Sequence, residues 1–385
     1  MLKPFLFLLL LCPLMLYAQQ SIKGNILDSD TGKPVPDASV FLNSASVGTK
    51  SADDGSFTLY NAKNGHYDLI VTCIGYQAYS QTVAVFNGDI VVPVIKLKPK
   101  IAELKEVVIK YVSDSDRKRY LQTFLTEFFG TTKNSSECKL LNPDVISFDY
   151  NKRTEKLKAS ADEFLIIENK ALGYRIKYLL ASFLKDALSR TVSYTGVSVF
   201  EPMTGSDKQQ SNWNKNRTIA YLGSQMNFLR ACINGDMLEE GFTVRELIRV
   251  PTTGRLTDSV INAKIKIFST TYGNNDSLSY WRNELRSPRF NESLGKRDLS
   301  DYEFVKLTQV KGIYAIGDYT CLLIKYKTKS DYFGTHSTIY TFKRKYAYFD
   351  SNGIVINPLD ANIEGYWGTQ RMADLLPVDY QLPQK

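Results

Sequence analysis

Histidine is scarce in this chain, and its scarcity limits the metal chemistry that the side chains can support. The 385 residues include two histidines, His66 and His336. Neither has a second histidine or a glutamate at the spacing that zinc sites use. The cysteines after residue 18 are too widely spaced for a metal knuckle, although one disulfide among them stays open. We therefore expect no zinc site, and no other pattern points to a cofactor.

Patterns for nucleophilic catalysis and phosphate binding are also incomplete. No serine lies in the G-x-S-x-G pattern of many hydrolases, and Gly223-Ser224 falls inside a predicted helix. Gly32-Lys33 resembles the end of a phosphate-binding loop, but Pro34 follows where serine or threonine is required. An ordinary helix and an ordinary turn explain both patterns better.

The carboxylates form two further candidate sites, and neither is complete. Asp28-x-Asp30-x-Gly32 has the start of a calcium loop, but no glutamate follows at the offset that would close it. Asp162 and Glu163 are neighbours on a predicted strand, so their side chains point to opposite faces. We therefore expect a protein that is not an enzyme. The alternative is a hydrolase of unfamiliar type that uses carboxylates in the C-terminal half.

Large aromatic side chains are the candidates for ligand contact. Trp213, Trp281 and the Tyr366-Trp367 pair offer flat rings that can stack on a sugar or clamp a peptide. A glycine stands on either side of the pair, which indicates a loop and makes it the first choice. Each ring can equally belong to a hydrophobic core.

The first residues have the composition of a secretory signal peptide. Lys3 gives a short positive region, and residues 5–17 form an apolar stretch that is short for a membrane span. The stretch is followed by a small residue, Ala18, so we expect residues 1–18 to be cleaved. Cys12 is not preceded by a small residue, so lipid attachment is not expected.

The rest of the composition predicts an exported, globular protein. Hydrophobic residues make up 43% and aromatic residues 12% of the chain, which favours ordered β structure. No later segment is apolar for long enough to form a transmembrane helix. The net charge is +8, but residues 21–110 hold nine lysines and nine acidic residues, so the excess lies beyond them. Because the chain is exported, nucleic acid is not an expected partner.

Residues 21–98 have the turns and the alternation of a small β-sandwich. Ile22 and Ile26 share one face of a first strand, and Gly32 supplies the positive φ of the turn that follows. Asn64-Gly65 is the strongest hairpin signal in the chain. The whole pattern predicts a sandwich of about seven short strands.

The motifs of this module recur in a known family of domains. They are Gly24-x-Ile26-x-Asp28, Thr31-Gly32-x-Pro34-Val35-Pro36-Asp37-Ala38-x-Val40, Gly48-Thr49-x-x-Ala52-Asp53-x-Gly55-x-Phe57, Gly65-x-Tyr67-x-Leu69-x-Val71 and Ile74-Gly75-Tyr76. With these motifs, residues 21–98 resemble the carboxypeptidase regulatory-like domain. The resemblance implies a seven-stranded immunoglobulin/transthyretin-like sandwich of the carbohydrate-binding-like type, which accompanies a catalytic unit but carries none of its ligands.

The remaining residues are expected to form a linker at 99–112 and an α+β domain at 113–385. A serine cap, at Ser113 or Ser115, and Gly130 bound a first helix with an apolar stripe. Helices and strands then follow without βα alternation, which predicts an antiparallel sheet with two or three helices. This half is similar to an uncharacterised C-terminal region that accompanies the regulatory-like module in some Gram-negative envelope proteins, and the resemblance implies no mechanism.

Several elements of this second domain are predicted individually. One helix is expected at residues 212–233, with Gly235 as its stop. Strands are expected at residues 260–268, 302–307, 313–326 and 339–349.

The sequence therefore predicts a mainly β, exported cell-envelope protein that acts as a non-catalytic adaptor or binding protein. Its sandwich is expected to mediate contact with a protein or glycan partner of the envelope. The mature chain is expected in the periplasm or associated peripherally with the outer membrane.

Overall fold

The structure, a computed structural model, describes residues 20–86, 88–100, 113–270, 274–327 and 334–383. It is mainly β with several antiparallel sheets, which confirms the predicted fold class. The predicted signal peptide at residues 1–18 lies outside the described residues, as does the predicted linker at 99–112 except for its first two residues. Seven helices occur in the described part of the chain, more than the two or three predicted. They are α1 (Asp114–Phe129), α2 (Asp207–Tyr221), α3 (Gln225–Asn234), α4 (Asp258–Ser269), α5 (Asn275–Arg286), α6 (Asp301–Phe304) and α7 (Tyr366–Thr369).

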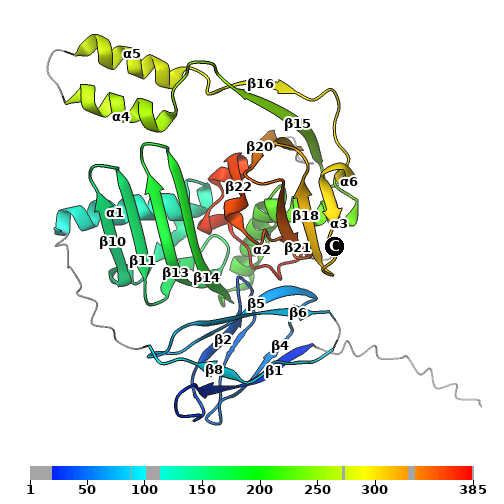
Figure 1. The fold of residues 1–385 in the computed structure, drawn as a ribbon. Helices are drawn as coiled ribbons and strands as arrows, with labels where there is room; N and C mark the ends of the chain where they lie inside the picture. The colour runs from blue at the N-terminus through cyan, green and yellow to red at the C-terminus, as the bar shows by residue number, and fades with distance from the viewer. Residues whose placement is uncertain (1–19, 87, 101–112, 271–273, 328–333, 384–385) are drawn as a thin grey trace, which may run out of the picture.

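The N-terminal module is a sandwich of two four-stranded sheets, which lies at the bottom of Figure 1. One sheet has the order β4-β1-β7, with β8 also paired to β1, and the other has the order β3-β2-β5-β6. Their inner faces enclose a core that includes Val40 and Leu69, both fully buried. The strands are β1 (Ser21–Asp28), β2 (Ser39–Leu42), β3 (Gly48–Lys50), β4 (Ser56–Tyr60), β5 (Gly65–Thr72), β6 (Tyr79–Val85), β7 (Ile90–Val91) and β8 (Ile95–Leu97).

The local predictions for this sandwich hold with one correction. Ile22 and Ile26 are fully buried on one face of β1, and Gly32 has a φ of 67°. The predicted hairpin at Asn64-Gly65 is wrong, because β4 pairs with β1 whereas β5 pairs with β2 and β6. The chain crosses from one sheet to the other at this point.

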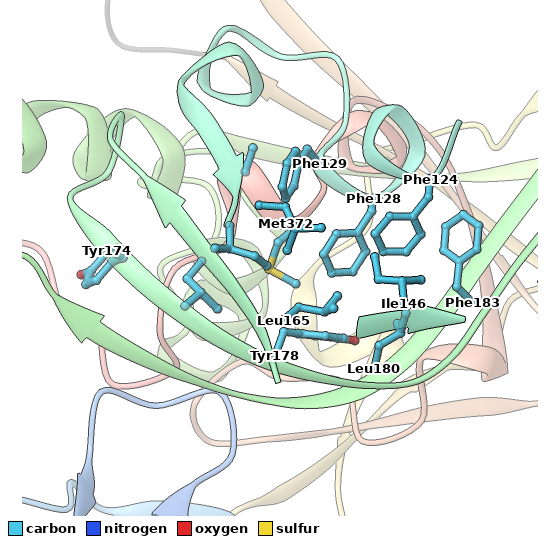
Figure 2. Close-up of a cluster of buried hydrophobic side chains, with 14 of the residues drawn as sticks. Phe124, Phe128, Phe129, Ile146, Leu165, Tyr174, Tyr178, Leu180, Phe183 and Met372 are labelled. Carbon is cyan, nitrogen blue, oxygen red and sulfur yellow. The ribbon is translucent and has the colours of Figure 1, made fainter. Parts of the chain in front are cut away.

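A six-stranded antiparallel sheet packs against α1 and forms a second core. Its order is β10-β11-β13-β12-β9, with β14 beside β13. Of the two serines predicted as caps, Ser113 caps α1, because its side chain accepts the Asp116 N–H. Phe124 and Phe128 are fully buried and face the sheet, as Figure 2 shows. The strands are β9 (Cys138–Leu140), β10 (Ile146–Asn151), β11 (Lys156–Ala161), β12 (Leu165–Asn169), β13 (Tyr174–Asp186) and β14 (Thr191–Pro202).

A third core lies around α3, so the region predicted as one α+β domain contains two separate cores. Here a five-stranded sheet of order β16-β15-β19-β20-β22 lies near a three-stranded sheet of order β17-β18-β21. Phe228, Phe242 and Phe304 are fully buried between them. The strands are β15 (Phe242–Pro251), β16 (Phe290–Leu294), β17 (Val305–Leu307), β18 (Ile313–Gly317), β19 (Cys321–Lys327), β20 (Thr335–Phe342), β21 (Tyr346–Asp350) and β22 (Ala361–Gly365).

The strand predicted at residues 260–268 is wrong, because this segment is helix α4. With α5 it forms a helical hairpin at the tip of the ribbon made by β15 and β16 (Figure 1). Ile261, Ile265 and Phe268 recur at helical spacing and are less exposed than Val260 and Lys264. Burial of that face outweighs the strand preference of the isoleucines.

The single helix predicted at residues 212–233 is two helices, α2 and α3. Gly223 has a φ of 78° between them, and Ser224 caps α3 by accepting the Asn227 N–H. The predicted strands at 302–307, 313–326 and 339–349 are also interrupted. Helix α6 occupies the first half of the first segment and β17 its second half, and turns divide the other two into β18 and β19 and into β20 and β21.

The sandwich is joined to the rest of the molecule by a hydrogen-bonded seam. The Ser44 N–H donates to the carbonyl of Ser198 at 2.7 Å, and the Phe200 N–H donates to the carbonyl of Ala45 at 2.9 Å. Phe41 of β2 packs edge-on against Phe164, with ring centroids 6.0 Å apart. The sandwich is therefore docked on the C-terminal region.

None of the helices in the described ranges combines the length and apolar character that a membrane span requires.

Candidate functional site

An open cleft of about 690 Å³ lies where the sandwich, helix α2 and the C-terminal tail (residues 375–383) meet, and it is termed the junction cleft. Its volume is within the range of ligand-binding clefts, about 300–1,000 Å³. Most of the side chains that line it carry hydroxyl or amide groups. They are Ser46, Val47, Gly48, Thr49, Thr58, Tyr60, Asn61, Lys63, Tyr174, Asn214, Arg217, Pro377, Asp379, Tyr380, Gln381 and Pro383.

Strand β4 supplies Tyr60, the exposed one of the three tyrosines that line the junction cleft. Phe57 and Leu59 point into the sandwich core and are 4% and 1% exposed. Because side chains alternate along a strand, Thr58 and Tyr60 point outward to the cleft. The Tyr60 side chain is 60% exposed, so its ring is available to a ligand.

Arg217 and Tyr174 form the side of the cleft nearest to α2. Arg217 donates from Nε to the carbonyl of Leu172 at 2.7 Å and from Nη2 to the carbonyl of Gly173 at 3.1 Å. Its guanidinium lies 4.1 Å from the centroid of the Tyr174 ring. Burial raises the pKa of Tyr174 to about 12, so its hydroxyl stays protonated at neutral pH. Figure 2 shows this hydroxyl pointing away from the other labelled core residues.

The C-terminal tail forms the wall opposite β4 and is fixed to the sandwich. Asp379 accepts the Ser46 N–H at 3.0 Å with one carboxylate oxygen and the Ser46 hydroxyl with the other. Lys63 Nζ donates to the carbonyl of Asp379 at 2.7 Å. Val378 is 5% exposed within the sandwich core, and its N–H donates to the carbonyl of Ser44.

Arg230 of α3 holds the same tail from the other side. Its guanidinium donates to three backbone carbonyls, those of Asn352, Val378 and Tyr380, at 2.7–2.8 Å. The tail wall of the cleft is therefore a fixed surface.

The charged groups of the junction cleft are already bound to other parts of the protein. Asp379, Lys63 and Arg217 all have the partners described above. By contrast, the side chains of Thr58, Asn61 and Gln381 make no hydrogen bond to another described residue. The cleft thus offers neutral donors and acceptors beside an exposed ring, which suits a neutral polar ligand.

Two of the four aromatic residues predicted to contact a ligand are core residues instead. Trp213 is 6% exposed; its indole N–H donates to the carbonyl of Lys170, and its ring packs on Gly173. Trp367 is 7% exposed, and its indole N–H donates to the carbonyl of Gly223 at 2.7 Å. Closed packing leaves neither ring a face for a ligand, so the prediction is wrong for both.

Tyr366 and Trp281 are half-buried and lie away from the junction cleft. Tyr366 belongs to the short helix α7 rather than to a loop, and it stacks on His336 with ring centroids 3.9 Å apart. Trp281 lies on α5 and contacts Tyr280 edge-on. Ligand contact by these two residues stays a prediction.

A second, smaller cleft of about 350 Å³ is lined by two glutamates and two arginines, together with Pro288 and Phe290. Arg249 donates to Glu292 at 2.8 Å and to Glu364 at 2.6 Å, and its guanidinium lies over the Phe290 ring. One guanidinium therefore engages both carboxylates.

Metal-binding and thiol chemistry have little support in the described part of the chain. No group of three or more His, Cys, Asp or Glu side chains is placed there to hold a metal ion. The four described cysteines, Cys73, Cys138, Cys232 and Cys321, are free thiols. Burial raises the pKa of Cys138 to about 12, which keeps it in the unreactive thiol form.

Sequence reasoning missed the junction cleft, although one signal for it was present. The alternation in β4 places Phe57 and Leu59 inward, so Tyr60 is an aromatic side chain on the solvent face. Nothing in the sequence indicates that α2 and the C-terminal tail meet this strand.

Comparison with known families identifies the N-terminal module. Residues 22–109 match the CarboxypepD_reg-like domain. The match confirms the resemblance carried by the motifs of residues 21–98, and it covers a minority of the chain. No curated protein matches this chain.

Solved structures are similar to the chain only weakly. The pilus 2b backbone protein of group B streptococcus is 17% identical, with a TM-score of 0.19, over 21% of this chain and 41% of its own. A type II cohesin–X-dockerin complex from Acetivibrio cellulolyticus is 12% identical, with a TM-score of 0.20, over 32% and 83%. A protein of unknown function from Bacteroides fragilis is 10% identical, with a TM-score of 0.18, over 90% and 94%. TM-scores this low carry no argument about this chain.

Proposed function

We propose that this protein is an exported, non-catalytic binding protein of the cell envelope whose junction cleft takes a segment of a neutral oligosaccharide. The observation that carries the proposal is the lining of the cleft, where the exposed Tyr60 ring stands beside the unengaged side chains of Thr58, Asn61 and Gln381. An aromatic face can stack on the apolar side of a sugar ring, while hydroxyl and amide groups pair with its hydroxyls.

The carboxylate content of the cleft supports a binding role. Among the described residues, Asp379 is the one acid that lines the cleft, and Ser46 occupies both of its oxygens. Glycoside hydrolysis generally uses two carboxyl groups on opposite sides of the bond that is cleaved. This cleft brings together only one.

The second candidate function is a hydrolase that works at the smaller cleft. The observation that favours it is the presence of Glu292 and Glu364 on one cavity. Because Arg249 binds both carboxylates, the arrangement resembles an ion-pair network more than an acid and base pair. A hydrolysis screen of the purified protein against E292Q and E364Q variants tests this candidate.

The binding proposal is tested with immobilised mature protein and a panel of neutral oligosaccharides. We expect at least one to bind, and Tyr60→Ala to weaken its binding about tenfold through loss of stacking. Tyr302→Ala is the matched control, because Tyr302 is 72% exposed and lies outside the cleft. Failure of every neutral oligosaccharide to bind, or equal losses in the two variants, would contradict the proposal.

Export is tested separately by fractionating cells and measuring the mass of the protein in each fraction. We expect a chain that begins at Gln19 in the envelope fraction. An uncleaved chain that remains in the cytosol would contradict this part of the proposal.

A further inference from the structure

Strand β6 is an open edge of the sandwich. It pairs with β5 along seven residues, from Tyr79 to Val85, and no other described strand pairs with it. The N–H and C=O groups on the outer side of an edge strand are a template for another strand. Among the described strands, none pairs with the outer N–H and C=O groups of β6.

The sequence of β6 lacks the features that usually block edge pairing. It contains no charged residue and no proline. The edge strands of the two largest sheets each carry a charge, at Lys139, Asp149, Glu201, Glu292 and Glu364. Charges and prolines discourage pairing of exposed edges. Edge strand β4 also lacks both, but it has five residues, so the seven-residue β6 is the longer unprotected edge of the sandwich.

The side chains of β6 also leave its backbone accessible. Val83 and Val85 point into the core and are buried, whereas Ser80, Thr82 and Ala84 point outward and are exposed. The outward side chains are small, so a strand can approach without a steric obstacle.

The charge distribution favours a second copy of this chain as the partner of β6. The chain carries a net charge of +8, yet residues 21–110 hold equal numbers of lysines and acidic residues. Two identical basic molecules repel each other least where their neutral parts meet. We propose that β6 pairs antiparallel with β6 of a second copy and joins the two sheets into one continuous sheet across a two-fold axis.

The register of this pairing follows from the strand itself. Side chains of residues directly opposite each other in a sheet point to the same face, whereas successive residues of one strand point to opposite faces. The two-fold axis must therefore lie at one residue, which is then opposite its own copy, and not between two successive residues. An axis at Thr82 lets all seven residues pair and places Thr82 opposite its own copy. It also sets Ser80 opposite Ala84 and Gln81 opposite Val83, and no pair brings like charges together.

This dimer would leave the junction cleft open. The cleft is lined by β3, whereas β6 lies at the other end of the same sheet. The inference is therefore independent of the function proposed for the cleft.

The register is tested by cysteine cross-linking of the mature protein. Thr82→Cys places two cysteines opposite each other, at the Cβ spacing of about 4.5–5.5 Å found for directly paired residues and within reach of a disulfide. We expect mild oxidation to give a covalent dimer of this variant on a non-reducing gel. Ser80→Cys is the matched control, because its opposite residue is Ala84, and the unmodified protein controls for the native cysteines.

The association is tested by sedimentation equilibrium over a concentration series. We expect a dimer, and we expect Thr82→Lys to give a monomer because it sets two ammonium groups face to face. Ser160→Lys, an exposed substitution on β11, adds the same charge elsewhere and should stay dimeric. A monomer at every concentration, which is also the result if β6 serves a strand of another protein, would overturn the proposal. So would a dimer that Thr82→Lys does not weaken.

Discussion

Arg230 concentrates the attachment of the C-terminal tail in one side chain, because three nitrogens of its guanidinium donate to three backbone carbonyls. Arg230→Lys keeps the charge but replaces the planar fork by a single ammonium group. We expect a loss of about 2 kcal/mol in the free energy of unfolding, measured by urea denaturation. Arg282→Lys on the exposed surface of α5 is the control and should change it by less than about 0.5 kcal/mol. Equal losses would contradict the role of Arg230.

Titration of the buried Asp374 makes the free energy of unfolding depend on pH. Burial raises its pKa, although the side chains of Thr132 and Asn134 donate to it. The folded state therefore binds this proton more tightly than the unfolded state. Its contribution to stability is complete below the unfolded pKa of about 4 and is lost as the pH rises through the folded pKa.

Asp374→Asn removes this titration and keeps an oxygen that accepts from Thr132. We expect the free energy of unfolding of the variant, relative to that of the unmodified protein, to increase between about pH 4 and pH 7. Urea denaturation at a series of pH values measures the difference. A difference that stays constant over this range would show that Asp374 has no raised pKa.

Gly223 lies in the turn between the end of α2 and the start of α3. Its φ is 78°, and a Cβ atom there would lie 2.5 Å from the Tyr326 ring. We expect Gly223→Ala to lower the free energy of unfolding by about 3 kcal/mol, because the strain of positive φ and a steric clash add. Gly32→Ala isolates the strain, since φ is 67° there and no atom lies within 4 Å. It should cost about 1 kcal/mol by the same measurement, and equal losses would contradict the clash.

Elements with local signals could be predicted from the sequence. The turn at Gly32 and the serine cap of α1 depend on residues that are neighbours in the chain. Both occur, the cap at Ser113, one of the two serines predicted for it. The strand prediction for residues 260–268 failed because the isoleucines of this segment favour a strand locally. The helical face that contains Ile261 is buried only in the folded protein.

The candidate site could not be predicted for a related reason. Tyr60, Arg217 and Asp379 meet in one cleft, although each comes from a different third of the sequence. The aromatic residues that stood out in the sequence, Trp213 and Trp367, are large enough to fill the core and do so. Their large rings suggested ligand contact in the sequence, but in the structure the same size serves core packing.

At the scale of the whole molecule, the C-terminal tail connects cores that are separate in the sequence. Val378 completes the core of the sandwich, and Leu376, with Met372 and Ala373 just before the tail, completes the core under α1. Arg230 ties the same tail to α3. The sandwich and the C-terminal region are therefore expected to unfold as one unit.

Truncation tests this coupling directly. A chain that ends at Leu376 loses Val378 from the sandwich core, the carboxylate that binds Ser46 and two of the Arg230 acceptors. We expect calorimetry to show one transition for the full chain and two for this truncation, with the sandwich unfolding first, because burial of one valine alone contributes about 1.5–3 kcal/mol. A chain that ends at Gln381 keeps all of these contacts and should still unfold in one transition. Two transitions in the full chain, or one unchanged transition after truncation at Leu376, would show that the tail does not couple the domains.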